Sequence, residues 1–188
     1  FSNGLDIERI KLEVGFPLAV KPVQEGSTIG ITRVDEVTEL ASAYELAKQY
    51  DDEVLLERWC EGKEFSVGIV AGQALPVIQV KPSSGFYDYK AKYESNDTQY
   101  LIPSGLSEAD ETTAKQLSLK AYESVGCTGW GRVDLIQDDQ GRFWLLEVNT
   151  VPGLTPHSLV PMEMKALGFD FTDLVLILLE EALRAHRG

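Results

Sequence analysis

The chain has 188 residues and a mass of 20.8 kDa, which suits one compact domain or two small lobes. Hydrophobic residues make up 44% and charged residues 25% of it, a balance that excludes a disordered or collagen-like polymer. The 17 Lys and Arg against 30 Asp and Glu give a net charge of -13, which opposes binding to nucleic acid or to an anionic membrane surface.

The cysteines and the apolar runs indicate where the protein works. Cys60 and Cys127 are too few for a disulfide framework and belong to no zinc-binding pattern, so we expect a cytoplasmic protein. The longest strongly apolar run, residues 174–179, is much shorter than the roughly 20 residues that span a bilayer, so we expect no membrane partner. Because the chain begins at Phe1 and its first methionine is Met162, we expect a piece of a longer polypeptide.

Apolar periodicity in the first third of the chain predicts two helices, each followed by a strand. The first helix ends at Gly15, and residues 16–20 form a short apolar strand that leads into Lys21. The second helix begins near Asp35, and a strand follows at residues 54–56. The apolar residues that define the two helical faces are Ile7, Ile10 and Val14, and then Val37, Leu40, Ala41 and Tyr44.

The middle of the chain predicts a strand pair, a long loop and a helix. Residues 65–70 and 75–80 have the composition of paired strands, whereas residues 81–103 show no clean period and are expected to form a loop. Ser107 then begins a helix that ends at Gly126. The apolar face predicted for this helix consists of Ala114, Leu117, Ala121 and Val125.

The last third of the chain predicts a hairpin and a terminal helix. Strands at residues 130–136 and 142–149 flank a turn at residues 138–141 that is rich in Asp and Gly. A segment with several prolines and glycines follows, and a helix begins at about Thr172.

The hairpin carries two acids that are predicted to lie opposite each other. Side chains alternate between the two faces of a strand, so Arg132 and Asp134 share one face, and Glu147 and Asn149 also share one. The register that closes the hairpin on residues 140–141 places Asp134 across from Glu147 and Arg132 across from Asn149. Two polar pairs therefore meet on one face.

Opposed carboxylates on neighbouring strands repel unless a cation lies between them. Two carboxylates and the amide oxygen of Asn149 suit a hard cation such as Mg²⁺ or Mn²⁺, and Mg²⁺ with few protein ligands also takes phosphate oxygens. The hairpin thus predicts a metal-bound nucleotide polyphosphate. The alternative is a solvated polar face on which Arg132 neutralises both acids.

A second segment has the composition of a phosphate-binding loop. Lys21 ends a strand directly before residues 22–30, where glycines allow backbone N–H groups to approach phosphate and Ser27 and Thr28 add hydroxyl donors. The segment matches neither the P-loop nor the dinucleotide-binding motif, and an ordinary turn has the same composition.

Four motifs in fixed order make a more specific signal: KPVQEGSTIG, GFYDYKAKY, GWGRVDL and LLEVNTVPGLTPHSLVP. Together they resemble the ATP-grasp ligases, and closely the D-alanine:D-alanine ligases, over essentially the whole chain. The resemblance implies an α+β ATP-grasp fold of two lobes with the nucleotide bound between them. It implies that residues 1–57 are part of the central lobe and residues 58–188 are the C-terminal lobe with the metal and D-alanine sites.

The resemblance implies a set of contacts to ATP. Lys21 and Ser27 match residues that touch the ATP phosphates, and Lys92 matches a phosphate-contacting lysine on a mobile loop. Glu64 matches the carboxylate that holds the ribose hydroxyls. The linker that binds adenine is matched by Glu57, Arg58, Trp59 and Cys60.

The resemblance also implies catalytic and substrate contacts. Arg132 and the backbone N–H of Gly153 match the oxyanion donors, and Ser158 and Leu159 match the site for the carboxylate of the second D-alanine. Tyr93 matches the side chain typical of enzymes that accept D-alanine rather than D-lactate. The metal ligands of the family, which hold two Mg²⁺ (or Mn²⁺), are matched by Asp134, Glu147, as the bridging ligand, and Asn149.

The implied reaction joins two D-alanines to D-alanyl-D-alanine for peptidoglycan precursor synthesis. ATP phosphorylates the carboxylate of the first D-alanine, the amine of the second attacks the acyl phosphate, and phosphate leaves. The partners are then ATP and D-alanine, and full-length members are expected to be homodimers. Family members also have a separate N-terminal domain and an additional ATP-contacting lysine, which this sequence lacks.

Several alternatives remain open. The chain could be a nucleotide-binding fragment without turnover, or part of another carboxylate–amine ATP-grasp ligase. A hydrolase that uses His157 and Ser158 is disfavoured because no G-x-S-x-G motif surrounds them. Tyrosines and lysines in residues 81–97 could form a nucleic-acid surface, but the negative charge of the chain favours a lid over ATP.

Overall fold

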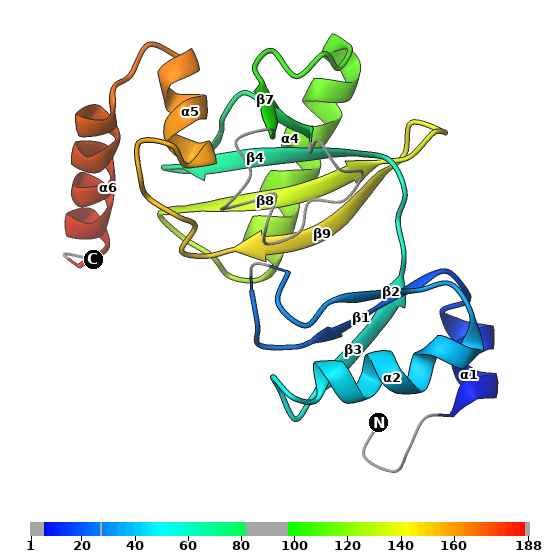
Figure 1. Ribbon diagram of the computed structural model, residues 1–188. Coiled ribbons are helices and arrows are strands. Elements are labelled where there is room, and N and C mark those ends of the chain that lie inside the picture. Colours follow the sequence, from blue (N-terminus) through cyan, green and yellow to red (C-terminus); the bar gives the residue numbers. More distant parts are fainter. Residues whose placement is uncertain (1–5, 27, 82–97, 187–188) are drawn as a thin grey trace. The chain divides into compact units, whose positions relative to one another are not determined.

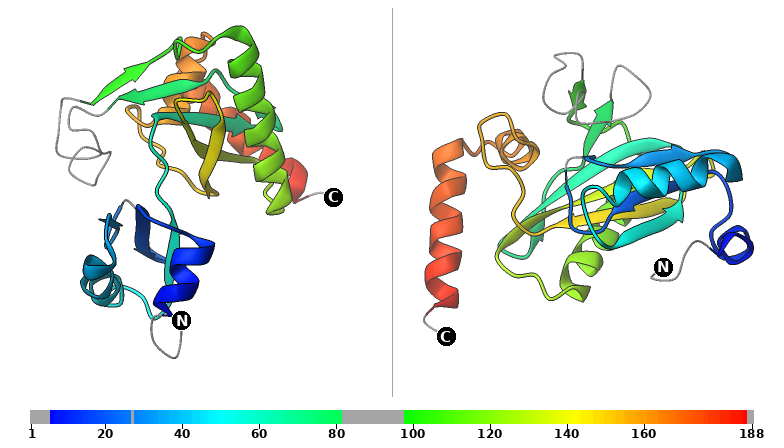
Figure 2. Two further views of the ribbon diagram at one scale, coloured as in Figure 1. Left: turned by 90° about the vertical axis from the view of Figure 1, so that its right-hand side faces the viewer. Right: turned by 60° about the horizontal axis from the view of Figure 1, so that its bottom comes forward.

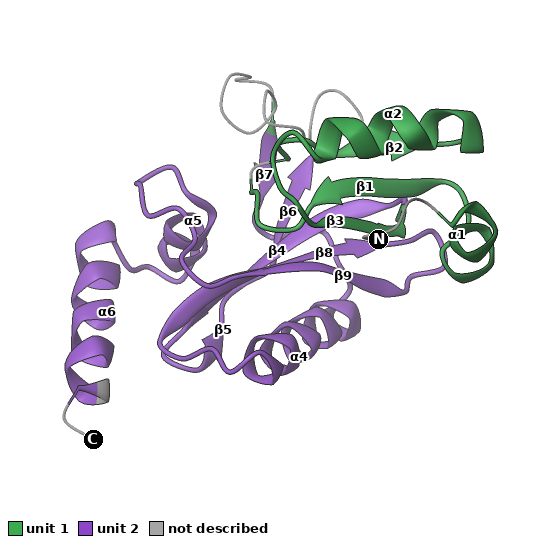
Figure 3. Cartoon of the chain, turned by 90° about the horizontal axis from the view of Figure 1, so that it is seen from below, with its two compact units in different colours: residues 1–60, 82–98 green, residues 61–81, 99–188 purple. Residues whose placement is uncertain are grey.

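A computed structural model describes residues 6–26, 28–81 and 98–186, and every structural statement below concerns these residues (Figure 1). The chain divides into two compact units, which Figure 3 shows in different colours. Unit 1 holds residues 1–60 and 82–98, and unit 2 holds residues 61–81 and 99–188. The predicted assignment of residues 1–57 and 58–188 to lobes of a longer enzyme stays a prediction.

Unit 1 is a three-stranded antiparallel sheet packed against two helices. Its sheet has the strand order β2-β1-β3. The core between sheet and helices contains Ile10, Leu18, Val20, Val34 and Leu40, all of them buried. The elements in chain order are α1 (Ile7–Glu13), β1 (Leu18–Pro22), β2 (Thr32–Val34), α2 (Val37–Ala47) and β3 (Val54–Arg58).

The two predicted helices of unit 1 are confirmed, and local capping explains where they begin. The Asp6 side chain accepts a hydrogen bond from the backbone N–H of Arg9 at 3.1 Å, and it thereby satisfies a donor that the first turn leaves free. At the start of α2, the Glu39 side chain accepts from the backbone N–H groups of Asp35 and Glu36. Strand β2 was not predicted, because three residues are too short for an alternating pattern.

Unit 2 is built on a larger antiparallel sheet with the path β7-β6-β4-β8-β9, and β5 pairs with β4 beside that path. Three described helices accompany the sheet. The strands are β4 (Lys63–Val70), β5 (Gln73–Ala74), β6 (Ile78–Lys81), β7 (Gln99–Leu101), β8 (Trp130–Gln137) and β9 (Phe143–Asn149). The helices are α4 (Glu108–Ser124), α5 (Leu159–Ala166) and α6 (Phe171–Ala185).

The two faces of this sheet differ in their cover, as the views in Figures 1 and 2 show. One face packs against α4 through an apolar cluster that includes Phe65, Val67, Val133 and Leu135. The other face carries Ser66 of β4 and Arg132 and Asp134 of β8, and α5 covers only one end of it. The second apolar cluster, which involves α5 and α6, consists of Val70, Leu75, Val160, Met164 and Leu174.

Proline explains two differences between the predicted and observed elements. The predicted strand at residues 75–80 is confirmed only from residue 78, where β6 begins; residues 75–77 separate β6 from the short strand β5, because Pro76 has no N–H to donate to a ladder. Helix α5 was not predicted, because Pro161 and the surrounding Pro/Gly-rich sequence conceal it. Pro161 lies in the first turn of α5, where its missing N–H does not break a helical hydrogen bond.

Two further expectations were wrong in part. Residues 99–101 of the predicted loop at residues 81–103 form β7, which pairs with β6, and residues 82–97 lie outside the described residues. The buried face of α4 is formed by Ala114, Ser118 and Tyr122, whereas Leu117 and Val125 are exposed. Tyr122 packs over Gly131 of β8, where a Cβ atom would stand 2.5 Å from the Tyr122 ring. The face of α4 that is buried therefore contains Tyr122 and leaves Leu117 exposed.

Within the described part of the chain, no helix has both the length and the apolar character that crossing a membrane requires.

Candidate functional site

The predicted pairing of the hairpin is confirmed where its polar residues lie. In the ladder of β8 and β9, Asp134 is opposite Glu147 and Arg132 is opposite Asn149. The predicted closure on residues 140–141 is wrong, because the register shifts by one residue between Asp134 and the next pair, Leu135 with Leu145. Leu146 is the extra residue of this β-bulge.

Five polar side chains meet on the face of the sheet that lies away from α4. We call them the Asp134 cluster, and they are Ser66, Arg132, Asp134, Glu147 and Asn149. Strand β4 contributes Ser66 because it pairs with β8 directly opposite Asp134. Three neighbouring strands, β4, β8 and β9, thus position the cluster.

Asp134 is the centre of this cluster and is only 7% exposed. Arg132 donates two hydrogen bonds to it, from Nε to Oδ1 at 2.9 Å and from a terminal nitrogen to Oδ2 at 2.8 Å. Ser66 Oγ donates to Oδ1 at 2.8 Å, and Asn149 Nδ2 donates to Oδ2 at 3.0 Å. The carboxylate of Asp134 is therefore fixed from three sides.

The charges of the cluster hold Arg132 in its cationic form. Burial lowers the pKa of Arg132, but the neighbouring carboxylates of Asp134 and Glu147 outweigh burial and raise that pKa above its usual value. Because the side chain of Arg132 is 17% exposed and that of Asp134 is 9% exposed, the pair is shielded from solvent. Glu147 is exposed, so one of the two opposed acids faces solvent.

The arrangement contains features of both sequence-based interpretations. Arg132 neutralises Asp134, as the alternative required, whereas among the described residues Glu147 is bound only by Asn149 Nδ2, at 3.2 Å from its Oε1. The donor set fits a hard divalent cation, since a rotation of the Asn149 amide would turn its oxygen toward both acids. Among the described residues, no three His, Cys, Asp or Glu side chains converge as a metal site. The metal ligation therefore stays a prediction that rests on two acids and an amide.

In unit 1, the predicted phosphate-binding lysine is held by a neighbouring acid. Lys21 Nζ lies 2.6 Å from Glu57 Oε1, and the two residues come from the paired strands β1 and β3. Trp59 follows β3 directly, and the guanidinium of Arg33, on β2, lies over its ring at 5.3 Å from the ring centroid. Cys60 Sγ lies 3.8 Å from the backbone carbonyl of Arg58. The predicted adenine linker is thus a defined continuation of β3.

Other predicted site residues are distributed as follows. Glu64 lies on β4, opposite Val80 and Ile136. Three predicted residues, Ser27, Lys92 and Tyr93, lie outside the described residues.

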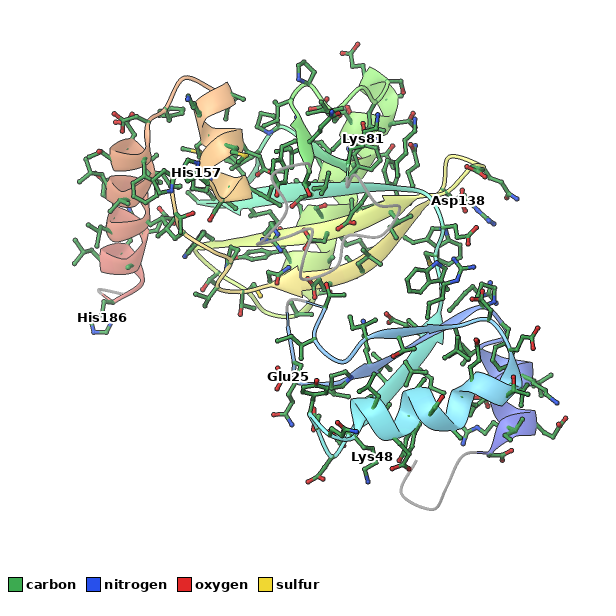
Figure 4. The ribbon with its side chains drawn as sticks, in the orientation of Figure 1. Glu25, Lys48, Lys81, Asp138, His157 and His186 are labelled. Carbon is green, nitrogen blue, oxygen red and sulfur yellow. The ribbon has the colours of Figure 1, made fainter. Side chains whose placement is uncertain are left out.

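The predicted acceptor site lies in the segment that leads into α5. Ser158 is the N-cap of α5, and its Oγ accepts a hydrogen bond from the backbone N–H of Thr155 at 3.0 Å. A Cβ atom on Gly153 would stand 3.2 Å from Ser158 Oγ, so these two predicted residues are neighbours. Leu159 follows as a buried residue. His157, labelled in Figure 4, is exposed, and Ser158 Oγ contacts the Thr155 hydroxyl at 2.9 Å.

The sequence analysis missed one titratable residue of this region, Glu163 on α5. It is completely buried, and its Oε2 accepts a hydrogen bond from the backbone N–H of Gly68 at 2.6 Å. Its Oε1 has no hydrogen-bond partner among residues 6–26, 28–81 and 98–186. Burial, as the largest influence, raises the pKa of Glu163 well above its usual value, against the opposing effects of Gly68 and Arg132. A buried acid in an unpredicted helix leaves no pattern in the sequence.

A comparison with protein families finds one that matches almost the whole chain. The family is described as "D-ala D-ala ligase C-terminus", and it matches residues 4–180. A D-alanine–D-alanine ligase of Acinetobacter baumannii is 48% identical over 180 residues, which are 95% of this chain and 58% of that protein. One of Pseudomonas putida is 51% identical over 97% of this chain and 57% of its own length. The chain thus spans just over half the length of these curated relatives.

Solved structures of D-alanine–D-alanine ligases and a related ligase are also similar to this chain. A D-alanine–D-alanine ligase from Bacillus anthracis superposes with a TM-score of 0.86 at 32% identity, over 98% of this chain and 60% of that one. The same enzyme complexed with ATP gives a TM-score of 0.83 at 30% identity, over 100% and 60%. The VanG D-Ala:D-Ser ligase from Enterococcus faecalis gives 0.82 at 33% identity, over 93% and 52%.

Proposed function

Because this chain belongs to the D-alanine–D-alanine ligase family and has its ATP-grasp fold, we propose that it is the ATP-binding and catalytic part of a D-alanine–D-alanine ligase. The observation that carries the proposal is the Asp134 cluster, which gathers two opposed acids, an amide and a fixed cation on one face of the sheet. The predicted reaction needs this combination of negative and positive groups.

The reaction proceeds in two steps. The carboxylate of the first D-alanine attacks the terminal phosphate of ATP, so an acyl phosphate forms and ADP leaves. The amine of the second D-alanine then attacks the acyl carbon, loses a proton, and the tetrahedral intermediate expels phosphate. Both steps develop negative charge, and transfer of a phosphoryl group depends mainly on positioning and electrostatic stabilisation.

Asp134, Glu147 and Asn149 are the residues that would hold Mg²⁺ or Mn²⁺. A divalent ion bound there would neutralise phosphate charge. Lys21, with Ser27 and Lys92 from the undescribed part of the chain, would contribute phosphate donors. In unit 1 the Lys21–Glu57 pair keeps the lysine extended along its sheet, at 2.6 Å from the acid.

Arg132 and the segment before α5 would serve the amino-acid substrates. Arg132 stays cationic and is held by two hydrogen bonds to Asp134, so it can stabilise a developing oxyanion without reorganising. Ser158 and Leu159 begin α5, where the free N–H groups of the first turn favour a carboxylate. The backbone N–H of Gly153, next to Ser158, would be the second oxyanion donor.

The whole protein would be a cytoplasmic homodimer in this proposal, with ATP and D-alanine as its partners. The net charge of -13 of the 188-residue chain supports the exclusion of nucleic acid. A second candidate function has one specific observation in its favour: the similarity to the VanG D-Ala:D-Ser ligase, with a TM-score of 0.82. The second substrate would then be D-serine.

The test measures phosphate release from ATP by the whole protein that contains this chain. D-alanine should stimulate release, and D-alanyl-D-alanine should appear in equal amount. A matched pair of variants sharpens the result: Glu147→Gln should abolish release, whereas Glu123→Gln on the exposed surface of α4 should not. Stimulation by D-serine but not D-alanine as acceptor would support the second candidate, and release without any amino acid would contradict both.

A further inference from the structure

Glu163 is out of place in the cluster that surrounds it. Helix α5 packs against the sheet through Val160 and Met164 of an apolar cluster, and Glu163 lies between this cluster and the charges of Arg132 and Asp134. A carboxyl group in such surroundings destabilises the fold unless a hydrogen bond compensates for lost hydration. Within the described part of the chain, the backbone N–H of Gly68 is the one hydrogen-bond partner of Glu163, and its second oxygen has none. Packing alone therefore does not account for this side chain.

The partner of Glu163 is a backbone N–H that the sheet leaves unpaired. Strand β4 pairs with β6 as far as Ser66 and with β5 from Ile69 onward, so Gly68 lies at the gap that separates β5 from β6. The carbonyl of Gly68 accepts a hydrogen bond from the backbone N–H of Leu75 at 2.8 Å, and the N–H of Gly68 donates one to Glu163 Oε2 at 2.6 Å. The acid thus replaces the missing strand partner.

Glycine at position 68 is what lets the carboxyl group approach. A Cβ atom there would overlap Glu163 Oε2 and also come within 2.9 Å of the Leu75 side chain. Gly68 is directly opposite Arg132 in the ladder of β4 and β8, two residues from Ser66, which holds Asp134. The contact therefore joins α5 to the strand that supports the Asp134 cluster.

Glu163 lies one helical turn after Leu159, on the helix that begins with Ser158. Apolar contacts between a helix and a sheet have no preferred direction, whereas a short hydrogen bond fixes both distance and angle. We propose that Glu163 is a positioning residue: its hydrogen bond to Gly68 fixes α5, and with it the acceptor site at Ser158 and Leu159, relative to Arg132. This inference rests on the proposed function, since it assigns a role within the same reaction.

The raised pKa of Glu163 supports this role, because a protonated carboxyl group still accepts from Gly68 through its carbonyl oxygen. A glutamine would do the same with its amide oxygen. Methionine has a similar length without an acceptor of comparable strength, so it keeps the packing and removes the hydrogen bond. Glu163→Gln and Glu163→Met are therefore a matched pair.

The experiment uses the whole protein and measures steady-state kinetics with ATP and D-alanine. Glu163→Met should raise the KM for the acceptor D-alanine about 10- to 100-fold, because a displacement of about 1 Å has effects of that order. The KM for ATP should stay within about twofold of the unchanged protein, and Glu163→Gln should restore the acceptor KM. An unchanged acceptor KM in Glu163→Met, or equal damage in Glu163→Gln, would overturn the proposal.

Hydrogen exchange at the Gly68 amide provides a readout that does not depend on activity. The amide should be protected in the unchanged protein and in Glu163→Gln, and it should exchange at least tenfold faster in Glu163→Met. Equal protection in all three would overturn the role of Glu163. Absence of D-alanine-dependent phosphate release from the unchanged protein would instead overturn the proposed function, whatever the exchange result.

Discussion

The two faces of the sheet in unit 2 are made by the same strands but are held together differently. The face under α4 is an apolar cluster in which Phe65, Val133 and Leu135 are at most 1% exposed. The opposite face places a cation and two acids on neighbouring strands, and hydrogen bonds at Asp134 connect them. Stability should therefore be concentrated on the first face and chemistry on the second, and five experiments test this division.

The largest effect should come from the apolar face. Phe65→Ala removes a ring that is 1% exposed and that packs edge-on against Phe143, with centroids 6.2 Å apart. The free energy of unfolding should fall by about 4 kcal/mol, as is typical of a buried aromatic side chain. Chemical denaturation checks this value. Leu145→Ala, at a position 54% exposed on the same sheet, should cost less than about 1 kcal/mol, and equal losses would contradict the asymmetry.

Removing the cation of the polar face should have the next largest effect. Arg132→Met leaves Asp134 buried without its partner, so the free energy of unfolding should fall by about 3 kcal/mol. Arg184→Met is the control, because Arg184 pairs with Glu180 and Glu181 at a position 72% exposed, where an ion pair contributes less than about 1 kcal/mol. If both variants lost the same stability in urea, the Asp134 cluster would not be a shielded site.

Binding of metal-bound nucleotide should stabilise the chain through the acids of the polar face. At 100 times its dissociation constant, ATP with Mg²⁺ should add about 2.7 kcal/mol to the free energy of unfolding, visible as a rise in Tm. Glu147→Ala should abolish this rise and leave the ligand-free Tm nearly unchanged, since Glu147 is exposed. An equal rise in Glu147→Ala would exclude this acid as a ligand of the metal-bound nucleotide.

The buried acid at the border of the polar face should make stability depend on pH. Burial is the largest influence on the pKa of Glu163 and raises it, and the charge of Asp134 also raises it. The hydrogen bond from Gly68 and the charges of Arg132 and Lys115 lower the pKa, but they do not outweigh burial. The folded-state pKa of Glu163 lies above the ordinary value of 4.5. The contribution of the protonated carboxyl group to stability is therefore fully present below about pH 4.5, and it is lost as pH rises through the folded-state pKa.

Glu163→Gln should remove this dependence. Its stability relative to the unchanged protein should grow by about 1.4 kcal/mol per pH unit above about pH 4.5, until the folded-state pKa of Glu163 is reached. Urea denaturation at a series of pH values measures the difference. Parallel curves would show that Glu163 has the same pKa in both states.

The smallest effect should come from the cap of α4. Ser107 Oγ accepts from the backbone N–H of Asp110 at 3.1 Å, and Ser107→Ala should therefore cost about 1 kcal/mol. Ser124→Ala, at the other end of α4, removes only a hydroxyl bound to a carbonyl of its own helix and should change stability by less than about 0.5 kcal/mol. Reversal of this order in thermal unfolding would contradict the capping argument.

The sequence was informative where structure depends on local patterns. Alternation along two adjacent strands showed which polar residues share a face, and the predicted register placed Asp134 opposite Glu147. The turn closure from which that register was chosen is wrong, and the β-bulge at Leu146, which no local pattern reveals, restores the pairing. The pairing of β4 with β8, which brings Ser66 to Asp134, joins residues far apart in the chain, and nothing local encodes it. The face of α4 was mispredicted because Tyr122 packs over a glycine of a distant strand.

Glu163 shows the limit of sequence patterns most clearly. A glutamate in a short helix that contains Pro161 looks like a surface residue, and only the packing of α5 on β4 reveals its burial. The roles predicted for Ser27, Lys92 and Tyr93 stay predictions, as does metal ligation by the hairpin. The family resemblance supplied those roles, whereas the geometry of the Asp134 cluster follows from the strands themselves.

The β-bulge at Leu146 determines which face of the sheet carries Glu147 and Asn149, the polar residues at the end of β9. Phe143 and Val148 both contact the cluster under α4, although their numbers differ in parity. Uninterrupted alternation from Phe143 would turn Glu147 and Asn149 toward that cluster as well. The bulge at Leu146 absorbs this mismatch, so that Glu147 and Asn149 face away from α4 while Phe143 and Val148 face toward it. A β9 strand without Leu146 would reach the same facing by regular alternation, whereas one that kept Leu146 in regular pairing would turn both polar side chains into the apolar layer.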